Sequence, residues 1–510
     1  MKELVPDVLF IEPDSSRESY GDLATDYSAI EPPTWSLLLA ESCRSKGYFP
    51  IIADQKAERL DDEVIITMIN DLKPRLVVMV VYGQNPNSGT ANMTGAQRLG
   101  DKITKSSAYN VPMGMIGSHI SALPLETMDK HGFIDIGFLG DGVYALHTVL
   151  SCDRIDTTDF SRVPGIVVRN ILGGHSEITA PGKMVPQERM DIDLPGYAWD
   201  LIPPLSEYRA HNWHPQYDPS RRSPFAAIYT SLGCAFKCEF CMINSINRSS
   251  SDSSVYAGMF SGMRYWSPEH MLKIFKELAE MGVETLRLSD EMFYLNRKYY
   301  EPILNGIIDR NLNFNMWAYT RVDTMKPKFL DLYKKAGVNL LCPGIEAASR
   351  DIRLEITKGK FQDVDIVDLV RQSEDHGIEV GANFIVGFPN EKIEDMQATR
   401  DLAFELNTQH MNVYTATNLP GSELHYNATR NGWKEPETYS GYSFLSYDYE
   451  AQPTAHVPAE EVLRFRDNMW HDYFTSENYL SMMKSKFGQV AVDNINNMTK
   501  IDMKRKMLGD

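Results

Sequence analysis

Cysteine, basic charge and long apolar runs are all scarce in this sequence, and each scarcity argues against a class of protein. The 510 residues include six cysteines, too few and too scattered for the disulfide framework of a small secreted chain. Lys and Arg number 51 against 69 Asp and Glu, and the net charge of −18 argues against a general nucleic-acid binder. No apolar run reaches the roughly 20 residues of a membrane span. The acidic N-terminus MKELVPDVLFIEP does not resemble a signal peptide. We therefore expect a cytoplasmic protein with no membrane span.

The first 150 residues alternate strand and helix patterns. The run LVVMVVYG is β-branched and unbroken, as in a strand that is buried on both faces. Strands that alternate with helices predict an α/β fold with a doubly wound parallel sheet. Ligands of such sheets bind beyond the carboxyl ends of the strands, where the turns here are rich in Gly, Ser and Asn, although the same turns suit ordinary strand-to-helix connections. The expected strands are 8–13, 49–54, 76–83, 111–119 and 134–142.

The rest of the chain predicts three further regions. Residues 151–224 carry several prolines and no clear periodicity, which is typical of an ordered linker. Residues 225–445 hold about six strand–helix units, too few for a closed eight-fold barrel, so a partial (β/α)6 barrel is expected. Residues 446–510 predict a small mixed or helical region with a helix near 457–475. We expect this region to cap the barrel and to help select the substrate.

Three of the cysteines, Cys234, Cys238 and Cys241, are spaced C-x3-C-x2-C. Cysteine thiolates are the standard ligands of iron–sulfur clusters. Three thiolates can hold three irons of a [4Fe–4S] cluster and leave the fourth iron open to a small molecule. A structural zinc site would need a fourth ligand, and no second pair of Cys or His is spaced to supply it. The spacing therefore predicts a catalytic cluster as the metal site.

This loop, with Phe240 before its last cysteine and the run PFAAIYTS in front of it, resembles the signature of the radical S-adenosylmethionine (SAM) superfamily. The resemblance implies that the methionine part of SAM chelates the open iron. It implies that the reduced cluster then splits SAM into methionine and a 5′-deoxyadenosyl radical. An electron donor such as flavodoxin or ferredoxin is implied as a partner.

Later segments resemble the same superfamily in order. LRLSDEMFYLNRK resembles its second-strand motif, which implies that Ser289 and Asp290 meet the methionine amine. GIEAAS resembles the fourth-strand motif, in which Glu346 would contact the ribose, although the usual Ser after it is Ala347 here. Arg321 ends a predicted strand, where its guanidinium can hold a carboxylate through two bonds. Simpler roles stay open: Asp290 as a helix N-cap, and Arg321 in a surface ion pair with the nearby Asp323.

The predicted first domain narrows the resemblance to radical SAM enzymes that carry a cobalamin-binding domain. EPPTWSLLLAESCRSKGY, GSHISALPLETM, GFLGDGVYAL and LPGYAWDLIP carry this resemblance. It implies a corrin ring between the two domains, facing SAM. The D-x-H-x-x-G signature is absent, because Asp129 and His131 stand at the wrong spacing, so cobalamin would bind without a protein imidazole. Some relatives keep this domain without cobalamin. The expected cobalamin contacts are Gln84, Ser88, Gly117, Ser118, His119, Gly140 and Gly142.

The resemblance implies methylation of an unactivated carbon in a small-molecule or natural-product substrate. One SAM would methylate the reduced cobalt, a second would give the radical, and the substrate radical would take the methyl from methylcobalamin. Two alternatives stay open. One is a radical rearrangement, dehydration or cyclisation with the first domain as scaffold, and the other is a non-catalytic cobalamin- or light-sensing module. The expected domains are 1–150 for cobalamin, 151–224 as linker, 225–445 as radical SAM barrel and 446–510 as substrate cap.

Overall fold

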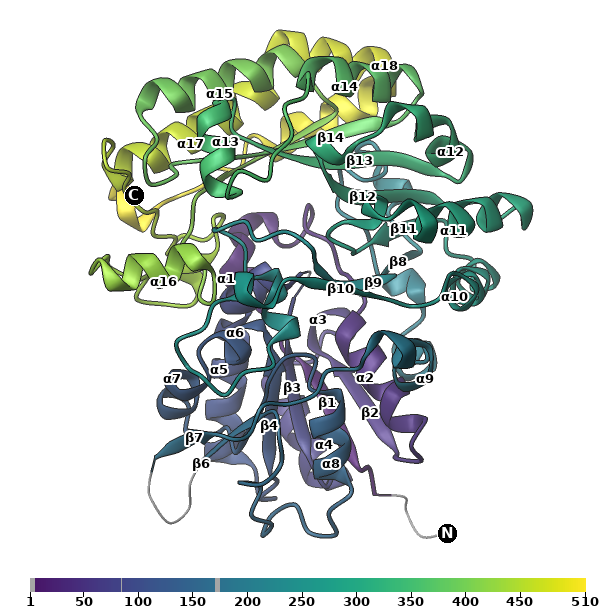
Figure 1. Ribbon diagram of the computed structural model, residues 1–510, viewed down its shortest axis with the longest axis vertical. Helices are drawn as coiled ribbons and strands as arrows, with labels where there is room; N and C mark the ends of the chain where they lie inside the picture. Colours follow the sequence, from purple (N-terminus) through teal and green to yellow (C-terminus); the bar gives the residue numbers. More distant parts are fainter. Residues whose placement is uncertain (1–4, 84, 170–174) are drawn as a thin grey trace.

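The computed structural model describes residues 5–83, 85–169 and 175–510, which form two sheets stacked along the long axis of the molecule (Figure 1). The first sheet has the strand order β2-β1-β3-β4-β5-β6-β7. Its first five strands pair in parallel and confirm the predicted doubly wound sheet. The chain order reverses between β1 and β3, which is where ligands of such sheets bind. The five strands are β1 (Val8–Glu12), β2 (Pro50–Asp54), β3 (Val77–Val81), β4 (Met113–Gly117) and β5 (Ile136–Phe138).

Side chains on the central strands alternate between two apolar cores, one on each face of the first sheet. Val78 and Val80 belong to one core, while Met79 and Val81 belong to the other, as the two-residue period of a strand requires. Helices cover both faces, so these strands are buried on both sides. The helices are α2 (Thr34–Arg44), α4 (Asp62–Leu72), α5 (Gly89–Ser106), α6 (Ser118–Ala122), α7 (Pro124–Lys130) and α8 (Val143–Leu150).

Two strands extend this sheet in a way that the sequence did not indicate. β6 (Ile166–Arg169) and β7 (Ser176–Ile178) pair antiparallel at its edge, although both lie in the segment that was expected to be only a linker. Both strands are short, and β7 is half-exposed, so neither has a long apolar run to mark it. The segment after β7 winds toward the second sheet through short 3-10 turns.

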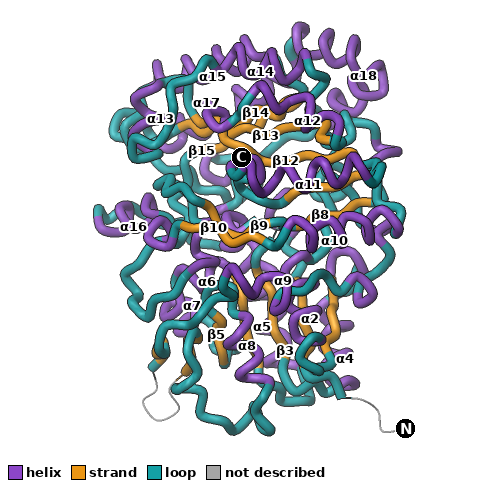
Figure 2. Tube along the Cα trace, turned by 45° about the vertical axis from the view of Figure 1, so that its right-hand side comes forward, coloured by secondary structure: helices purple, strands orange, loops and turns teal. Residues whose placement is uncertain are grey.

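The second sheet has six parallel strands in the order β15-β14-β13-β12-β11-β8, which confirms the partial barrel. Figure 2 shows the hairpin β9–β10 between the two sheets. It pairs Cys234 with Gly262 and carries the first cysteine toward the space between the sheets. The strands are β8 (Phe225–Ile228), β9 (Ser231–Cys234), β10 (Gly262–Tyr265), β11 (Thr285–Leu288), β12 (Asn315–Arg321), β13 (Val338–Glu346), β14 (Glu379–Val386) and β15 (His410–Thr415).

Helices follow the barrel strands and run along the outside of the second sheet (Figure 2). The C-terminal pair α17 and α18 covers the edge at β15, where the Arg466 guanidinium donates to the Val413 carbonyl at 2.8 Å. No helix in the described part of the chain is both long and apolar enough to cross a membrane. The helices are α10 (Pro268–Glu280), α11 (Arg297–Asp309), α12 (Leu330–Lys335), α13 (Arg350–Ile356), α14 (Ile366–Asp375), α15 (Ile393–Leu406), α16 (Glu423–Arg430), α17 (Ala459–Thr475) and α18 (Glu477–Met498).

Candidate functional site

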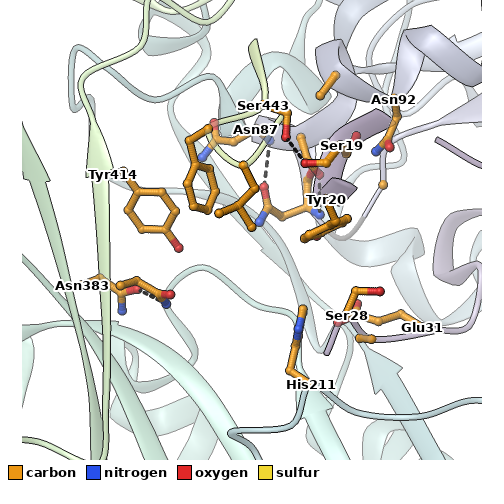
Figure 3. Close-up of a pocket in the computed structure, with 18 of the residues that line it drawn as sticks. Ser19, Tyr20, Ser28, Glu31, Asn87, Asn92, His211, Asn383, Tyr414 and Ser443 are labelled. Atoms are coloured by element: carbon orange, nitrogen blue, oxygen red, sulfur yellow. Dashed lines mark hydrogen bonds between the residues drawn. The ribbon is translucent and has the colours of Figure 1, made fainter. Parts of the chain in front are cut away.

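A cavity of about 570 Å³ lies between the two sheets. Its walls come from the carboxyl ends of β1, β2 and β3, from the cysteine loop, from the inner face of the barrel and from the C-terminal region (Figure 3). This is the position that the strand order predicts for a ligand of the first sheet. Among the residues expected from the sequence, the cavity brings together Ser88, Cys234, Cys238, Phe240, Cys241, Arg321 and Glu346.

The cysteine loop is held in shape by backbone conformation and by one amide side chain. Gly233 has a φ of +84°, and a Cβ there would lie 2.3 Å from the Gly262 carbonyl, so only glycine fits the hairpin. Asn244 accepts a hydrogen bond from the Cys234 amide at 2.8 Å and donates to the Phe236 carbonyl at 3.1 Å. The loop is therefore fixed by the protein itself, before any ligand binds.

Burial controls the protonation of the three thiols. It raises the pKa of Cys234 to about 12 and that of Cys238 to about 11, and it raises the pKa of Cys241 well above its usual value. The protein alone therefore favours neutral thiols, and coordination to metal would displace their protons. In the described ranges, no group of three or more His, Cys, Asp or Glu residues is placed to hold one metal ion. An iron–sulfur cluster does not need the three thiolates to meet at one point, because each thiolate binds a different iron.

Arg321, at the end of β12, forms a buried ion pair rather than the surface pair that was the simpler alternative. Its Nε and Nη2 lie 2.7 Å from the two carboxylate oxygens of Asp323. Its guanidinium also stacks 3.7 Å from the centre of the Phe236 ring. Nη1 is buried and has no hydrogen-bond partner in the structure, so this arginine keeps the two N–H groups of Nη1 for a ligand.

Glu346 ends β13 in a conformation that few non-glycine residues adopt. Its φ is +67°, in the left-handed region. Burial raises the pKa of its carboxyl to about 7. A Cβ at Gly344 would lie 2.4 Å from Glu346 Oε1, so the glycine leaves room for the carboxylate. A strained, half-buried acid on a cavity wall is typical of a functional position.

Ser289 and Asp290, the polar residues after β11 that were expected to meet SAM, do not line the cavity. Asp290 is fully buried and accepts hydrogen bonds from the Thr230 amide at 2.9 Å and hydroxyl at 2.8 Å, so it fixes the β8–β9 connection instead of lining the cavity. Ser289 is buried as well, with its amide on the Ile228 carbonyl at 2.7 Å. The next residue, Glu291, does line the cavity. Burial raises the pKa of Glu291 to about 7, and its Oε1 has no hydrogen-bond partner in the structure.

The turn after β3 brings the first sheet into contact with the cysteine loop. The Ser118 hydroxyl donates to the Pro86 carbonyl at 2.6 Å and holds this turn in place. Asn87 Oδ1 accepts from the Met242 amide at 3.0 Å, which directs Nδ2 toward Cys241 Sγ at 3.9 Å, the outer limit for a sulfur acceptor. Figure 3 shows Asn87 beside the cavity.

Most of the expected cobalamin contacts lie behind the cavity wall. His119 Nδ1 is 3.1 Å from the Thr90 hydroxyl, and burial lowers the pKa of His119 to about 3, so it is a neutral, internally bonded side chain. The Gly140 carbonyl accepts from Tyr82 at 2.8 Å. Ser88 lines the cavity, and Gln84 lies outside the described residues. The residues that do not line the cavity are Gly117, Ser118, His119, Gly140 and Gly142.

Sequence reasoning also missed several residues of the cavity wall. Glu12 and Asp54 end neighbouring strands in register, and burial raises the pKa of both carboxyls. Their positions at strand ends were the available signal. Trp35 lies in the Pro-Pro segment, and Trp470 reaches the cavity from α17. Four nearby C-terminal aromatics have other places: Tyr449 bonds Thr417, Tyr447 is exposed, and Tyr473 and Phe474 belong to the core.

Comparison with known proteins agrees with this geometry. Residues 228–403 match the family described as the Radical SAM superfamily. The chain contains a radical SAM domain. It is 27% identical over 398 residues to an uncharacterized methyltransferase of Pyrococcus horikoshii, covering 77% of each chain. It is 24% identical over 429 residues to an anaerobic magnesium-protoporphyrin IX monomethyl ester cyclase of Rubrivivax gelatinosus, covering 82% of this chain and 69% of the relative.

Two solved structures share the fold beyond the radical SAM domain. The radical SAM methyltransferase TsrM of Kitasatospora setae, solved with tryptophan and a SAM analogue, superposes with a TM-score of 0.64 at 16% identity and covers 97% of this chain and 98% of its own. The cobalamin-dependent radical SAM enzyme OxsB, solved with aqua-cobalamin and SAM, gives a TM-score of 0.60 at 14% identity and covers 91% and 61%. The chain thus has the fold of these enzymes, with the radical SAM domain behind a doubly wound domain.

Proposed function

We propose that this protein is a cobalamin-dependent radical SAM methyltransferase that methylates an unactivated carbon of a small-molecule or natural-product substrate. One observation carries the proposal: the three-cysteine loop and the ligand-binding edge of the first sheet line the same cavity. The relatives named as methyltransferases and the fold shared with TsrM support it. An electron donor such as flavodoxin or ferredoxin would reduce the cluster, in the reducing cytoplasm that free cysteines favour.

The residues around the cysteine loop suit a cluster with bound SAM. Cys234, Cys238 and Cys241 would hold three irons, and the cluster with SAM would supply the radical while cobalamin carries the methyl group. Glu291 offers an unpartnered carboxylate oxygen to an ammonium group, and Arg321 offers the N–H groups of Nη1 to a carboxylate. The cysteine loop, Glu291 and Arg321 would together hold the amino-acid end of SAM.

The first-domain wall suits a corrin ring, whose rim carries amide groups. It offers hydroxyls and amides that can donate and accept hydrogen bonds. No His, Cys or Met of residues 5–83 or 85–169 lines the cavity, so the first domain as described offers no imidazole to cobalt. The serines and asparagines of this wall include Ser15, Ser16, Ser19, Asn85, Asn87, Ser88 and Asn92.

Methyl-labelled SAM tests the proposal without knowledge of the substrate. Full-length protein loaded with cluster and cobalamin is expected to move label onto cobalamin and, when reduced, to release 5′-deoxyadenosine under anaerobic conditions. Cys234→Ala should abolish 5′-deoxyadenosine release because the cluster loses a ligand. Cys152→Ala is the matched control, since Cys152 lies away from the cavity. Release of 5′-deoxyadenosine without labelled cobalamin would favour the rearrangement alternative. If the loaded protein gives neither signal, both the methyltransferase proposal and the rearrangement alternative are overturned.

A further inference from the structure

The cavity extends into the barrel, where its lining changes in character. We call this region the inner chamber and define it by Tyr319, Asn383, Asn412 and Tyr414 on the strands and by the segment 211–213. Figure 3 shows Asn383, Tyr414 and His211 arranged around the same space. None of the residues assigned above to the cluster, SAM or cobalamin belongs to it, so this chamber is available to the substrate.

A chain of directed hydrogen bonds runs along the inner chamber. Asn412 Nδ2 donates to Asn383 Oδ1 at 3.0 Å, which leaves Asn412 Oδ1 to accept from His410 Nε2 at 3.1 Å. His410 Nδ1 then accepts from the Tyr217 hydroxyl at 2.8 Å. Burial lowers the pKa of His410 to about 3, so every member of the chain is uncharged. By this count Asn412 keeps one N–H, and Asn383 Oδ1 keeps one lone pair.

Two arginines lie beside the chamber, and each already holds a carboxylate. Arg287, which stacks 5.5 Å from the Tyr319 ring, directs Nη1 at both carboxylate oxygens of Glu31, at 2.8 and 2.7 Å. Its Nε and Nη2 have no hydrogen-bond partner, but Arg287 does not line the cavity. Arg466 donates to the Val413 carbonyl at 2.8 Å and to Asp467 at 2.7 Å. An anion that entered the chamber would be desolvated without an ion pair to either arginine, which is unfavourable.

Stacked rings form the other side of the inner chamber. The Trp213 ring stacks on His211 with centroids 5.3 Å apart and an angle of 10°, and on His410 at 4.9 Å and 14°. His211 and Trp213 both line the cavity and remain half-buried. Such rings offer apolar area and favourable stacking or edge contacts to a planar ligand.

We propose that the inner chamber binds an uncharged ring of the substrate that carries an amide-like edge, and that it rejects carboxylates and phosphates. Asn383 Oδ1 would accept a hydrogen bond from a donor on that edge, and the remaining N–H of Asn412 would donate to an acceptor there. The stacked ring of Trp213 would contact the ring of the ligand. This inference rests on the proposed function only in naming the bound compound as the methyl acceptor.

Three probes of one size test the charge and edge requirements: benzamide, benzoate and benzylamine. Their affinities for the full-length, cluster-loaded protein with saturating SAM, which would occupy Arg321, are measured by ligand-observed NMR and equilibrium dialysis. Benzamide is expected to bind at least tenfold more tightly than either charged probe, benzoate or benzylamine. Asn412→Leu is expected to weaken benzamide at least fivefold and to leave benzoate unchanged. Asn92→Leu, an amide on the first-domain wall, is the matched control and should change neither.

Equal or tighter binding of benzoate, no detectable binding of benzamide, or an unchanged benzamide affinity in Asn412→Leu would overturn the inference. If Asn412→Leu does not fold, the order of the three probes on the wild-type protein still decides. If the probes bind in the expected order but the protein neither labels cobalamin nor cleaves SAM, the inference about the inner chamber stands and the proposed function is overturned. If the protein cleaves SAM but prefers benzoate, the proposed function stands and the inference about the inner chamber is overturned.

Discussion

Two adjacent acids after β11, Asp290 and Glu291, have different surroundings and predict different mutant effects. Asp290→Asn is expected to lower the free energy of unfolding by about 1–3 kcal/mol, because the amide cannot accept all the hydrogen bonds from Thr230 and Ser231. Glu291→Gln is expected to leave stability unchanged or higher, because it removes a buried charge without a hydrogen-bond partner at Oε1. It should weaken SAM binding instead. Urea unfolding and SAM equilibrium dialysis on both variants measure this, and equal losses of stability would contradict the assignment.

His119 predicts a pH effect on stability. Its pKa is about 3 in the folded protein, below the usual 6.5, because it is buried. The unfolded chain therefore binds the proton first, and stability is lost as the pH falls below 6.5. Between neutral pH and pH 5 this residue should account for about 2 kcal/mol of that loss. Urea unfolding at both pH values checks this against His119→Gln, whose loss should be smaller by that amount, and equal losses would contradict it.

The cysteine loop, Arg321 and Glu346 were expected at the site because each stands at a strand end in a recognisable motif, and all of them line the cavity. Glu291 also lines it, whereas Ser289 and Asp290 were the residues expected there, and the difference has a physical reason. β11 ends at Leu288, and the irregular backbone after it no longer alternates sides, so spacing could not tell which of three consecutive polar residues points into the cavity. The glycine-rich turns were likewise identified, but packing placed most of their residues behind the wall.

The turn that carries Asn87 is the element that predicts a redox effect. Hydrogen bonds to a ligand sulfur raise the potential of an iron–sulfur cluster. Asn87→Asp keeps an acceptor for the Met242 amide but replaces the N–H that faces Cys241, so the cluster potential should fall. A fall of about 59 mV would be a tenfold change in the ratio of reduced to oxidised cluster.

Redox titration of the reconstituted cluster, followed by electron paramagnetic resonance, measures the effect of Asn87→Asp. Asn92→Asp is the control, since it adds a carboxylate to the same cavity wall, where no hydrogen bond joins its side chain to the cysteine loop. Equal shifts in the two variants would mean that charge alone, and not the contact with Cys241, sets the potential.

Strands with long apolar runs could be predicted from the sequence, and short strands with polar residues could not. The five strands expected in the first domain are all present, and each forms in a largely buried apolar run. β6 and β7 were missed because they are short edge strands whose pairing partner is far away in the sequence.

An ion pair between Glu31 of the first domain and Arg287 of β11 joins the two halves of the molecule. The pair is almost completely buried, and its members are 256 residues apart. Glu31→Gln would leave the Arg287 charge buried without its partner and should cost about 3–5 kcal/mol of stability. The double variant Glu31→Gln with Arg287→Met should recover most of that loss. Thermal unfolding of the three proteins measures this, and a single variant as stable as the wild type would contradict it.

No local pattern in the sequence could have predicted this pair, because it depends on how the two domains face each other. The resemblance to a known class supplied the order of the domains. It did not supply the contacts between them or the lining of the inner chamber, which comes from strand interiors and from a segment expected to be linker.

The Asn87 turn lies against the cysteine loop from the side of the first domain, and the segment 442–445 lines the same cavity from the C-terminal side. The three cysteines of the loop remain half-exposed where they face the cavity, so dioxygen would reach a cluster there through the cavity. The lifetime of the cluster in air would then measure how accessible the cavity is. A ligand that fills the cavity should lengthen that lifetime, so an enzyme at work would be better protected from air than one at rest.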